Sequence, residues 1–282
     1  MQKNFKLEEI IMFNKNELIL DKVRSLVTHD LSTSQLLFRL TSIEEPSLQC
    51  TAEGEEITDA IGAVITTLYR AKKATFSATN SLISLDLAAS QYGAKKEVAS
   101  VGNKIVDHTY EILTVKNVTE GEGDETTTKG IITLTHVPVN DIKFIYSIVN
   151  GEIGTAYKAG AIVSDTEFVI DASAKTITVP TGLTGKVYVE YQYETENAVR
   201  IVNRASQFPE ACSLTIYAYF KDRCNENLVY SGKIICPKAK LNPEQVELAL
   251  TSTGKHAFEF TMMKDYCSDE GEDELFTIIV AQ

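Results

Sequence analysis

CSLTIYAYF, residues 212–220, alternates between apolar and polar side chains with a period of two. On an extended strand, one face would receive Leu214, Ile216, Ala218 and Phe220, and the other Ser213, Thr215, Tyr217 and Tyr219. This pattern predicts a strand with one face packed on a core and the other facing solvent or a partner.

Further β-type runs lie on both sides of this stretch. Strands are predicted at residues 22–27, 35–40, 58–71, 228–236, 245–250, 256–262 and 275–280. The acidic segment 53–56 is predicted as a turn before the strand at 58–71. A single short helix is predicted from Asn80 or Ser81 to Gly93, with Leu82, Leu85 and Tyr92 among the residues of its buried face. The flanks are therefore predicted to form an α+β fold that is mainly β: a barrel or sandwich with one short helix.

The middle of the chain differs in composition from these flanks. Residues 103–196 hold none of the six arginines and none of the five cysteines, and they hold 14 acidic against 7 basic residues. Such a shift predicts a separate module inserted into a host domain. We expect a discontinuous host formed by residues 1–102 and 197–282, with residues 103–196 as the inserted domain, whose two ends lie close together.

The insert reads as β structure throughout. Strands are predicted at residues 131–135, 143–149, 167–170, 176–179 and 186–193, with turn signals between them such as Asn150-Gly151. Short strands at this spacing predict a small β-sandwich or a partial barrel. Residues 119–129, TEGEGDETTTK, lack apolar side chains and are predicted to form a mobile loop.

The overall composition is that of a globular protein with an acidic surface. Hydrophobic residues make up 44%, and the net charge is −12. This charge disfavours a grip on the outside of DNA, because phosphate neutralisation by cations supplies most non-specific affinity. The sequence lacks an apolar run long enough for a transmembrane helix, and its first residues do not resemble a signal peptide. We expect synthesis in a reducing compartment and no membrane anchor.

The reactive side chains do not form a known catalytic or metal-binding motif. The chain contains no GxGxxG, GxxxxGK[ST], GxSxG or HExxH motif. The cysteines, expected to be reduced and metal-free, are Cys50, Cys212, Cys224, Cys236 and Cys267. The histidines, which show no clustered carboxylates, are His29, His108, His136 and His256. The acidic run 269–274 lacks the spacing of a calcium loop. We therefore expect no catalytic residue, no cofactor, no metal and no enzymatic activity.

The amino-terminal residues 5–20 form a partly apolar segment. Leu7, Ile10, Ile11 and Phe13 make a partial helical face, and Glu8, Glu9 and Glu17 argue against a membrane anchor. We expect a helix or arm that docks on a neighbouring subunit.

The order of elements outside the insert resembles that of bacteriophage tail tube proteins, also called major tail proteins. The similarity covers a strand pair at 20–40, a turn and long strand at 53–69, and a strand-then-helix unit at 72–93, KKATFSATNSLISLDLAASQYG. It continues with FPEACSLTIYAYF at 208–220, IICPKAKL at 234–241, HAFEFTMMKD at 256–265 and the strand at 275–280. The insert, with TAYKAG and KVYVEYQYETENA, is similar to β modules that virion proteins present in surface loops, and this similarity implies an immunoglobulin-like β-sandwich.

This resemblance implies a structural virion protein made in the host bacterial cytoplasm and located in the viral tail. Its copies would form stacked hexameric rings around a channel that conducts DNA during ejection. A channel of that kind needs an acidic wall that does not bind phosphates, so DNA would pass without specific binding. The insert would project outward, and the excursion 52–73 would reach adjacent subunits. Other tail proteins, such as a sheath or terminators, are the further partners that the resemblance implies.

Three other classes of function remain open. A head-decoration or capsid-associated β protein would form trimers or bind only to a preformed shell. An extracellular, carbohydrate-binding β protein would show exposed aromatic clusters and a signal peptide. An enzyme ranks behind both, because no catalytic motif supports it.

Overall fold

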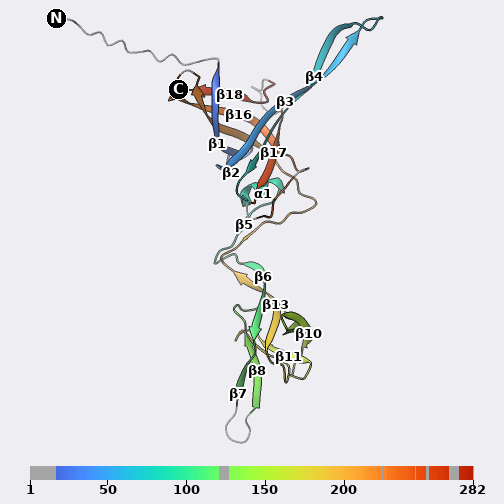
Figure 1. The fold of residues 1–282 in the computed structure, drawn as a ribbon, viewed down its shortest axis with the longest axis vertical. Coiled ribbons are helices and arrows are strands. Elements are labelled where there is room, and N and C mark those ends of the chain that lie inside the picture. The colour runs from blue at the N-terminus through green and yellow to red at the C-terminus, as the bar shows by residue number, and fades with distance from the viewer. Residues whose placement is uncertain are drawn as a thin grey trace, which may run out of the picture. The chain divides into compact units, whose positions relative to one another are not determined.

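The computed structural model describes residues 17–120, 127–223, 225, 227–244, 246–251, 254–266 and 273–281. The chain divides into two compact units, unit 1 (Met1–Lys96 with Ile201–Gln282) and unit 2 (Glu97–Arg200) (Figure 1). Unit 2 includes a few more residues at each end than the predicted insert, 103–196, because β5 (Glu97–Val98) pairs with β14 (Val199–Arg200). That unit 2 folds independently stays a prediction.

Unit 1 is a curved sheet of eight strands with one helix. Its elements are β1 (Leu18–Asp30), β2 (Leu36–Leu40), β3 (Ile43–Thr58), β4 (Val64–Asn80), α1 (Leu85–Gln91), β15 (Ala211–Asp222), β16 (Val229–Leu241), β17 (His256–Met262) and β18 (Thr277–Ala281). The strand order is β2-β1-β15-β16-β17-β4-β3, and β18 pairs with the first half of β16. With unit 2 also built of strands, the mainly β fold class with one short helix is confirmed.

The core of unit 1 lies on one face of this sheet. On β15, the alternation predicted for residues 212–220 is confirmed: Leu214 and Ile216 are fully buried, whereas Thr215 and Tyr217 are half-buried on the opposite face. On β17, Phe258 and Phe260 pack into the same core, and the predicted strand 256–262 matches the observed one. Burial of these large apolar side chains is the main stabilisation of the sheet.

Helix α1 is shorter than predicted. It begins after Ser84, whose hydroxyl caps the helix by accepting a hydrogen bond from the amide of Leu87, and Leu87 is its fully buried residue. The predicted buried residues Leu82 and Leu85 are instead exposed, because β4 continues through Asn80 and the chain turns before the helix starts. The predicted stop at Gly93 is confirmed: its φ is +62°, and an added Cβ would lie 2.2 Å from the carbonyl oxygen of Phe208.

Two further predictions for unit 1 are wrong. The acidic residues 53–56 form part of β3 instead of a turn, and the real turn joins Thr58 to Val64. There the carboxylate of Asp59 accepts hydrogen bonds from the amides of Ile61 (3.0 Å) and Ala63 (2.8 Å). The strand predicted at 245–250 is also absent from the described residues, where Leu248 makes only an isolated bridge to His256.

Unit 2 holds a second sheet of eight strands. They are β6 (Ile105–Thr114), β7 (Lys116–Glu120), β8 (Thr127–Thr133), β9 (Phe144–Val149), β10 (Glu152–Ala159), β11 (Glu167–Asp171), β12 (Thr176–Thr178) and β13 (Lys186–Thr195). The order is β6-β13-β9-β10-β11-β12-β8-β7. Strands from both halves of this order contribute to one core, with Ile132, Ile145, Phe168 and Val187 at its centre, so the sheet folds back on itself.

In unit 2, the turn predicted at Asn150-Gly151 is confirmed, whereas some of the strands were not predicted. Asn150 and Gly151 both have positive φ, 54° and 88°, which is typical of a type I′ hairpin turn. Strand β10, however, was missed because its side chains are nearly all exposed and do not alternate. The loop predicted at 119–129 is partly wrong, since β7 and β8 extend into it from both ends; residues 121–126 lie outside the described residues.

Candidate self-assembly surface

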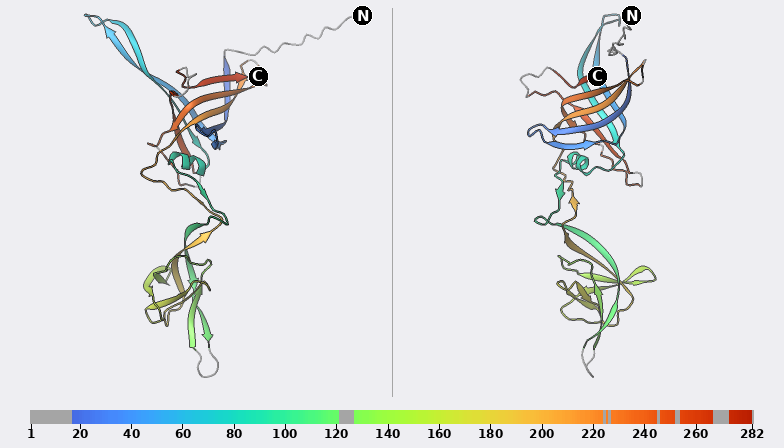
Figure 2. Two further views of the ribbon diagram at one scale, coloured as in Figure 1. Left: turned by 180° about the vertical axis from the view of Figure 1, so that it is seen from behind. Right: turned by 90° about the vertical axis from the view of Figure 1, so that its left-hand side faces the viewer.

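The most conspicuous surface of unit 1 is a two-stranded ribbon, residues 51–73, which we call the arm. Strand β17 pairs along β4 only as far as Ala74, whereas β3 and β4 stay paired beyond it to Thr58 and Val64. The arm extends away from the rest of the sheet (Figure 2). It corresponds to the excursion 52–73 singled out in the sequence, but it is built from two strands instead of the single one predicted.

Large apolar side chains are concentrated toward the end of the arm. Ile61 is 89% exposed, Ile65 66% and Tyr69 76%. The other exposed apolar residues of the arm are Ile57, Val64 and Leu68. The register places Leu68 and Ile57 on one face of the ribbon and Tyr69 and Val64 on the other, so both faces expose apolar side chains. Exposure of several large apolar side chains to water is unfavourable and makes the arm a candidate interaction surface.

The sheet of unit 1 also ends in strand edges that present backbone groups. β2 and β3 are the two edge strands of the order. β18 pairs only with β16, so it also has an edge without a partner strand among the described residues. Leu36 on β2 is 58% exposed, and Ile278 on β18 is 54% exposed. Edges with exposed apolar side chains favour pairing with another chain.

The face of this sheet opposite the core has an uneven charge. Near the β2 edge, the guanidinium of Arg24 on β1 lies 5.7 Å from the ring of Tyr219, and on the central strand β16 the ammonium of Lys233 lies 5.9 Å from the ring of Tyr217. Toward the other end, beside β3 and β17, three carboxylate side chains line a shallow hollow of about 260 Å³. These are Glu45, Glu247 and Glu259. The side of this face near β2 therefore carries the cation Arg24, and the side near β3 carries the carboxylate of Glu45.

The reactive side chains that the sequence drew attention to lie apart from this surface or within the core. Burial raises the pKa of the Cys212 thiol to about 12 and that of Cys236 to about 11, which disfavours the reactive thiolate. Cys50 is exposed, and all three thiols are free. Cys224 and Cys267 lie outside the described residues, so the prediction that every cysteine is reduced stays a prediction.

The four histidines occupy separate places. His256 is fully buried between β17 and α1, and burial lowers its pKa to about 4. His29 lies on β1, His108 lies on β6, and the ring of His136 stacks on Tyr193 at 3.9 Å. In the part of the chain that the structure describes, His, Cys, Asp and Glu side chains form no group of three suited to a metal ion.

Most of the segment 5–20, predicted to dock on a neighbour, lies outside the described residues. Its last residues belong to β1, where Ile19 is 46% exposed and Leu20 53%. Of the acidic run 269–274, only Asp273 and Glu274 are described. Within the described ranges, no helix has the length and apolar character that a membrane crossing requires.

Sequence reasoning located the arm but missed the uneven charge of the sheet face. The signal was present in the sequence, since Tyr217 and Tyr219 were placed on the polar face of their strand. Their cationic partners come from β1 and β16, and the order of the strands in the sheet is needed to bring them together.

The model of the YomU/Tube protein family matches residues 18–273. No curated protein matches the chain.

Proposed function

Because this chain belongs to the YomU/Tube protein family, we propose that it is a structural protein of a bacteriophage tail tube. Its copies assemble into hexameric rings, and the rings stack into a tube that conducts DNA. The chain acts by self-association and by contact with other tail proteins, not by catalysis, and its place is the tail of the virion.

The arm is the observation on which this proposal mainly rests. A monomer gains nothing from a ribbon whose apolar residues, such as Ile61 and Ile65, are exposed to water. In an assembly, the same side chains are buried against a neighbouring copy. Each Å² of apolar surface removed from water stabilises the contact by roughly 25 cal/mol. The arm therefore reaches an adjacent copy, within a ring or between rings.

The sheet edges and the uneven charge support a head-to-tail arrangement. An interface that joins two different surfaces of the same chain closes into a ring when its rotation permits. Placing the edge near β2 of one copy beside the edge near β3 of the next brings Arg24 of β1 toward Glu45 of β3. Opposite charges favour this orientation over its reverse.

The charge of the chain supports a channel through which DNA slides. Six copies of net charge −12 repel phosphates. Several cations of unit 1 are already paired with carboxylates: Lys221 with Asp21 at 2.8 Å, and Lys255 with Glu44 at 2.8 Å. We propose that the channel wall is acidic and that unit 2, too large for the channel, lies on the outside of the tube.

The role proposed for the arm is tested by substituting charged residues for its exposed apolar ones. Ile61→Asp combined with Ile65→Asp removes apolar contact area and introduces two carboxylates at positions that are solvent-exposed in the monomer. We expect the variant to stay monomeric at concentrations at which the unmodified chain forms large particles in sedimentation velocity. Its thermal unfolding midpoint should change little, because the arm contributes little to the core.

The matched control is Ile162→Asp, since Ile162 is 78% exposed but lies in unit 2. It should assemble as the unmodified chain does. Assembly of the arm variant to the same size and extent would contradict the role proposed for the arm.

A further inference from the structure

The outward face of strands β6, β13 and β9 in unit 2 is unusually rich in aromatic side chains. On β13, Val187, Val189 and Tyr191 point into the core, so Tyr188, Glu190 and Gln192 point outward. The register places Tyr188 between Ile112 of β6 and Tyr146 of β9, and it places Glu190 beside Tyr110 and Gln192 beside His108. Residues from three neighbouring strands therefore meet on one surface.

The tyrosine rings of this surface contact one another. Tyr110 stacks on Tyr188 with 5.6 Å between ring centroids and 27° between planes. Tyr146 meets Tyr188 edge-on at 6.2 Å and 62°. Tyr110 is 65% exposed, and Phe144 nearby is 51% exposed. The packed rings hold one another in place and leave aromatic surface open to a ligand.

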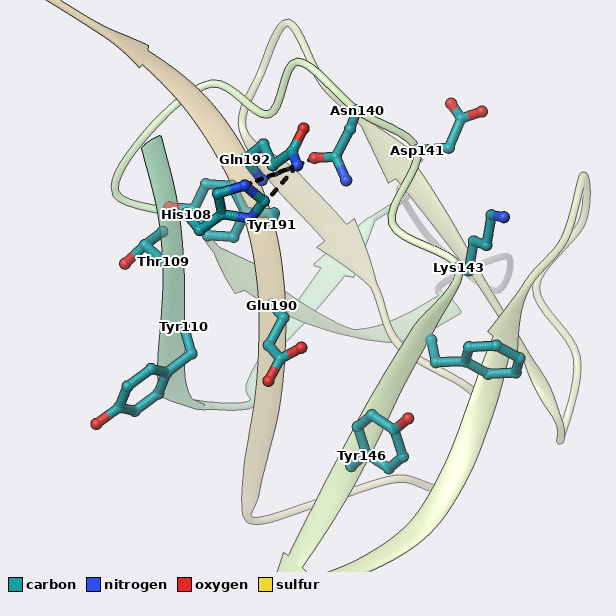
Figure 3. Close-up of a pocket in the computed structure, with 11 residues that line it drawn as sticks. His108, Thr109, Tyr110, Asn140, Asp141, Lys143, Tyr146, Glu190, Tyr191 and Gln192 are labelled. Carbon is teal, nitrogen blue, oxygen red and sulfur yellow. Dashed lines mark hydrogen bonds between the residues drawn. The ribbon is translucent and has the colours of Figure 1, made fainter. Parts of the chain in front are cut away.

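Polar groups border the same surface around an open hollow of about 550 Å³ (Figure 3). The side-chain amide nitrogen of Gln192 lies 3.1 Å from Nε2 of His108, and the backbone amide of Gln192 donates to the side-chain oxygen of Asn140 at 2.7 Å. The hydroxyl of Tyr188 donates to Glu190, a bond that raises the pKa of Tyr188 to about 12 and keeps this hydroxyl neutral. The volume falls within the roughly 300–1,000 Å³ typical of small-molecule sites.

The charges around the hollow restrict the class of ligand. Glu190 and Asp141 oppose the single ammonium of Lys143. Unit 2 as a whole holds 15 acidic and 8 basic residues. Phosphates and other anions are therefore repelled, which disfavours nucleotides and nucleic acids even though their bases stack on aromatic rings.

We propose that this surface binds a neutral saccharide. The C–H groups on one face of a sugar ring have partial positive charge and pack favourably on the electron-rich face of an exposed tyrosine such as Tyr110. Its hydroxyl groups both donate and accept hydrogen bonds, which matches the mixture of carboxylate, amide and imidazole groups at Glu190, Gln192 and His108. The site is shallow and open, so it accommodates part of a longer glycan chain.

The test uses the full chain and neutral glycans. The labelled protein is screened on an array of neutral oligosaccharides, and any binder is then measured by isothermal titration. Oligothymidylate is the comparison ligand, because its bases can stack on the tyrosine rings but its phosphates carry negative charge. We expect at least one neutral glycan to bind and oligothymidylate not to bind.

Two variants locate the binding. Tyr110→Ala removes an exposed stacking surface and should weaken glycan affinity at least tenfold, whereas Tyr110→Phe keeps the ring and should retain most of it. The matched control is Tyr266→Ala, since Tyr266 is 82% exposed but lies in unit 1. An unchanged thermal unfolding midpoint shows that Tyr110→Ala is folded. Failure of every neutral glycan to bind, preferential binding of oligothymidylate, or equal affinity in Tyr110→Ala would each overturn the proposal.

Discussion

Nε2 of His256 donates a hydrogen bond to the side-chain oxygen of Gln91 at 2.5 Å, which ties β17 to helix α1. Nδ1 of the same ring accepts from the amide of Ser84 at 3.4 Å, and the side-chain nitrogen of Gln91 donates to the carbonyl of Ala257 at 3.0 Å. The ring is fully buried and neutral in this arrangement. A second proton on Nδ1 would face the donor of Ser84, so protonation opposes the packing of α1 on the sheet.

This arrangement predicts a loss of stability in mild acid. Burial lowers the pKa of His256 to about 4 from 6.5. The unfolded chain therefore binds a proton at higher pH than the folded chain, and stability falls as pH drops from 6.5 toward 4. The loss is at most about 3 kcal/mol. Chemical denaturation at pH 7 and pH 4.5 measures it.

The variant His256→Gln isolates this contribution. It should be less stable at pH 7, by about 1–3 kcal/mol, but should lose less between pH 7 and pH 4.5 than the unmodified chain. Carboxylates with lowered pKa, such as Asp30 at about 2, lose their contribution progressively below about pH 5. This loss is the same in the variant and the unmodified chain, so the difference between the two chains reports on His256. The control His29→Gln should keep the normal pH dependence. An equal slope in His256→Gln and the unmodified chain would show that His256 is not the group responsible.

Unit 2 is expected to fold by itself. It has its own core, in which Phe168 and Ile145 are fully buried, and β5 pairs with β14 where the chain enters and leaves. Residues 97–200 expressed alone should give a β-type circular dichroism spectrum and a cooperative thermal transition. Phe168→Ala should lower the stability of this fragment by roughly 3–5 kcal/mol.

Ile162→Ala is the matched control, because Ile162 is 78% exposed, and it should change stability by no more than about 0.5 kcal/mol. A fragment that gives no cooperative transition would refute the proposed domain boundary.

The thiols are expected to differ sharply in reactivity. Cys50 is exposed on β3, whereas the raised pKa values of Cys212 and Cys236 and their burial protect them. Under native conditions, alkylation followed by mass spectrometry should label Cys50 within minutes and leave Cys212 and Cys236 unlabelled. Both should react fully in denaturant. Rapid native labelling of Cys236 would mean that the core of unit 1 opens far more often than its packing implies.

The parts of the fold that the sequence predicted are those where burial alternates along a strand. Residues 256–262 were placed correctly because Phe258, Phe260 and Met262 all face one core. Strand β10 had no such signal, since every residue in it except the half-buried Tyr157 is exposed. The acidic residues 53–56 looked like a turn because the arm lacks a buried face within the chain itself. A strand pair that is exposed on both faces gives no alternating burial pattern that a sequence can show.

The contacts around α1 were beyond sequence reasoning for another reason. Gln91 bonds to Ala257 and His256, more than a hundred residues away in the chain, and these contacts depend on how the sheet brings β17 beside the helix. The aromatic surface of unit 2 likewise depends on the register of three strands, of which β6 was not predicted. Side-chain clusters of this kind follow from topology, which a single sequence specifies only indirectly.

Electron cryo-microscopy of concentrated, full-length protein tests the central claim most directly. We expect stacked six-fold rings in which the arm contacts an adjacent copy, carboxylates line the channel, and unit 2 lies on the outside. Closed trimers, or six-fold rings whose channel is lined with Lys and Arg, would contradict the account.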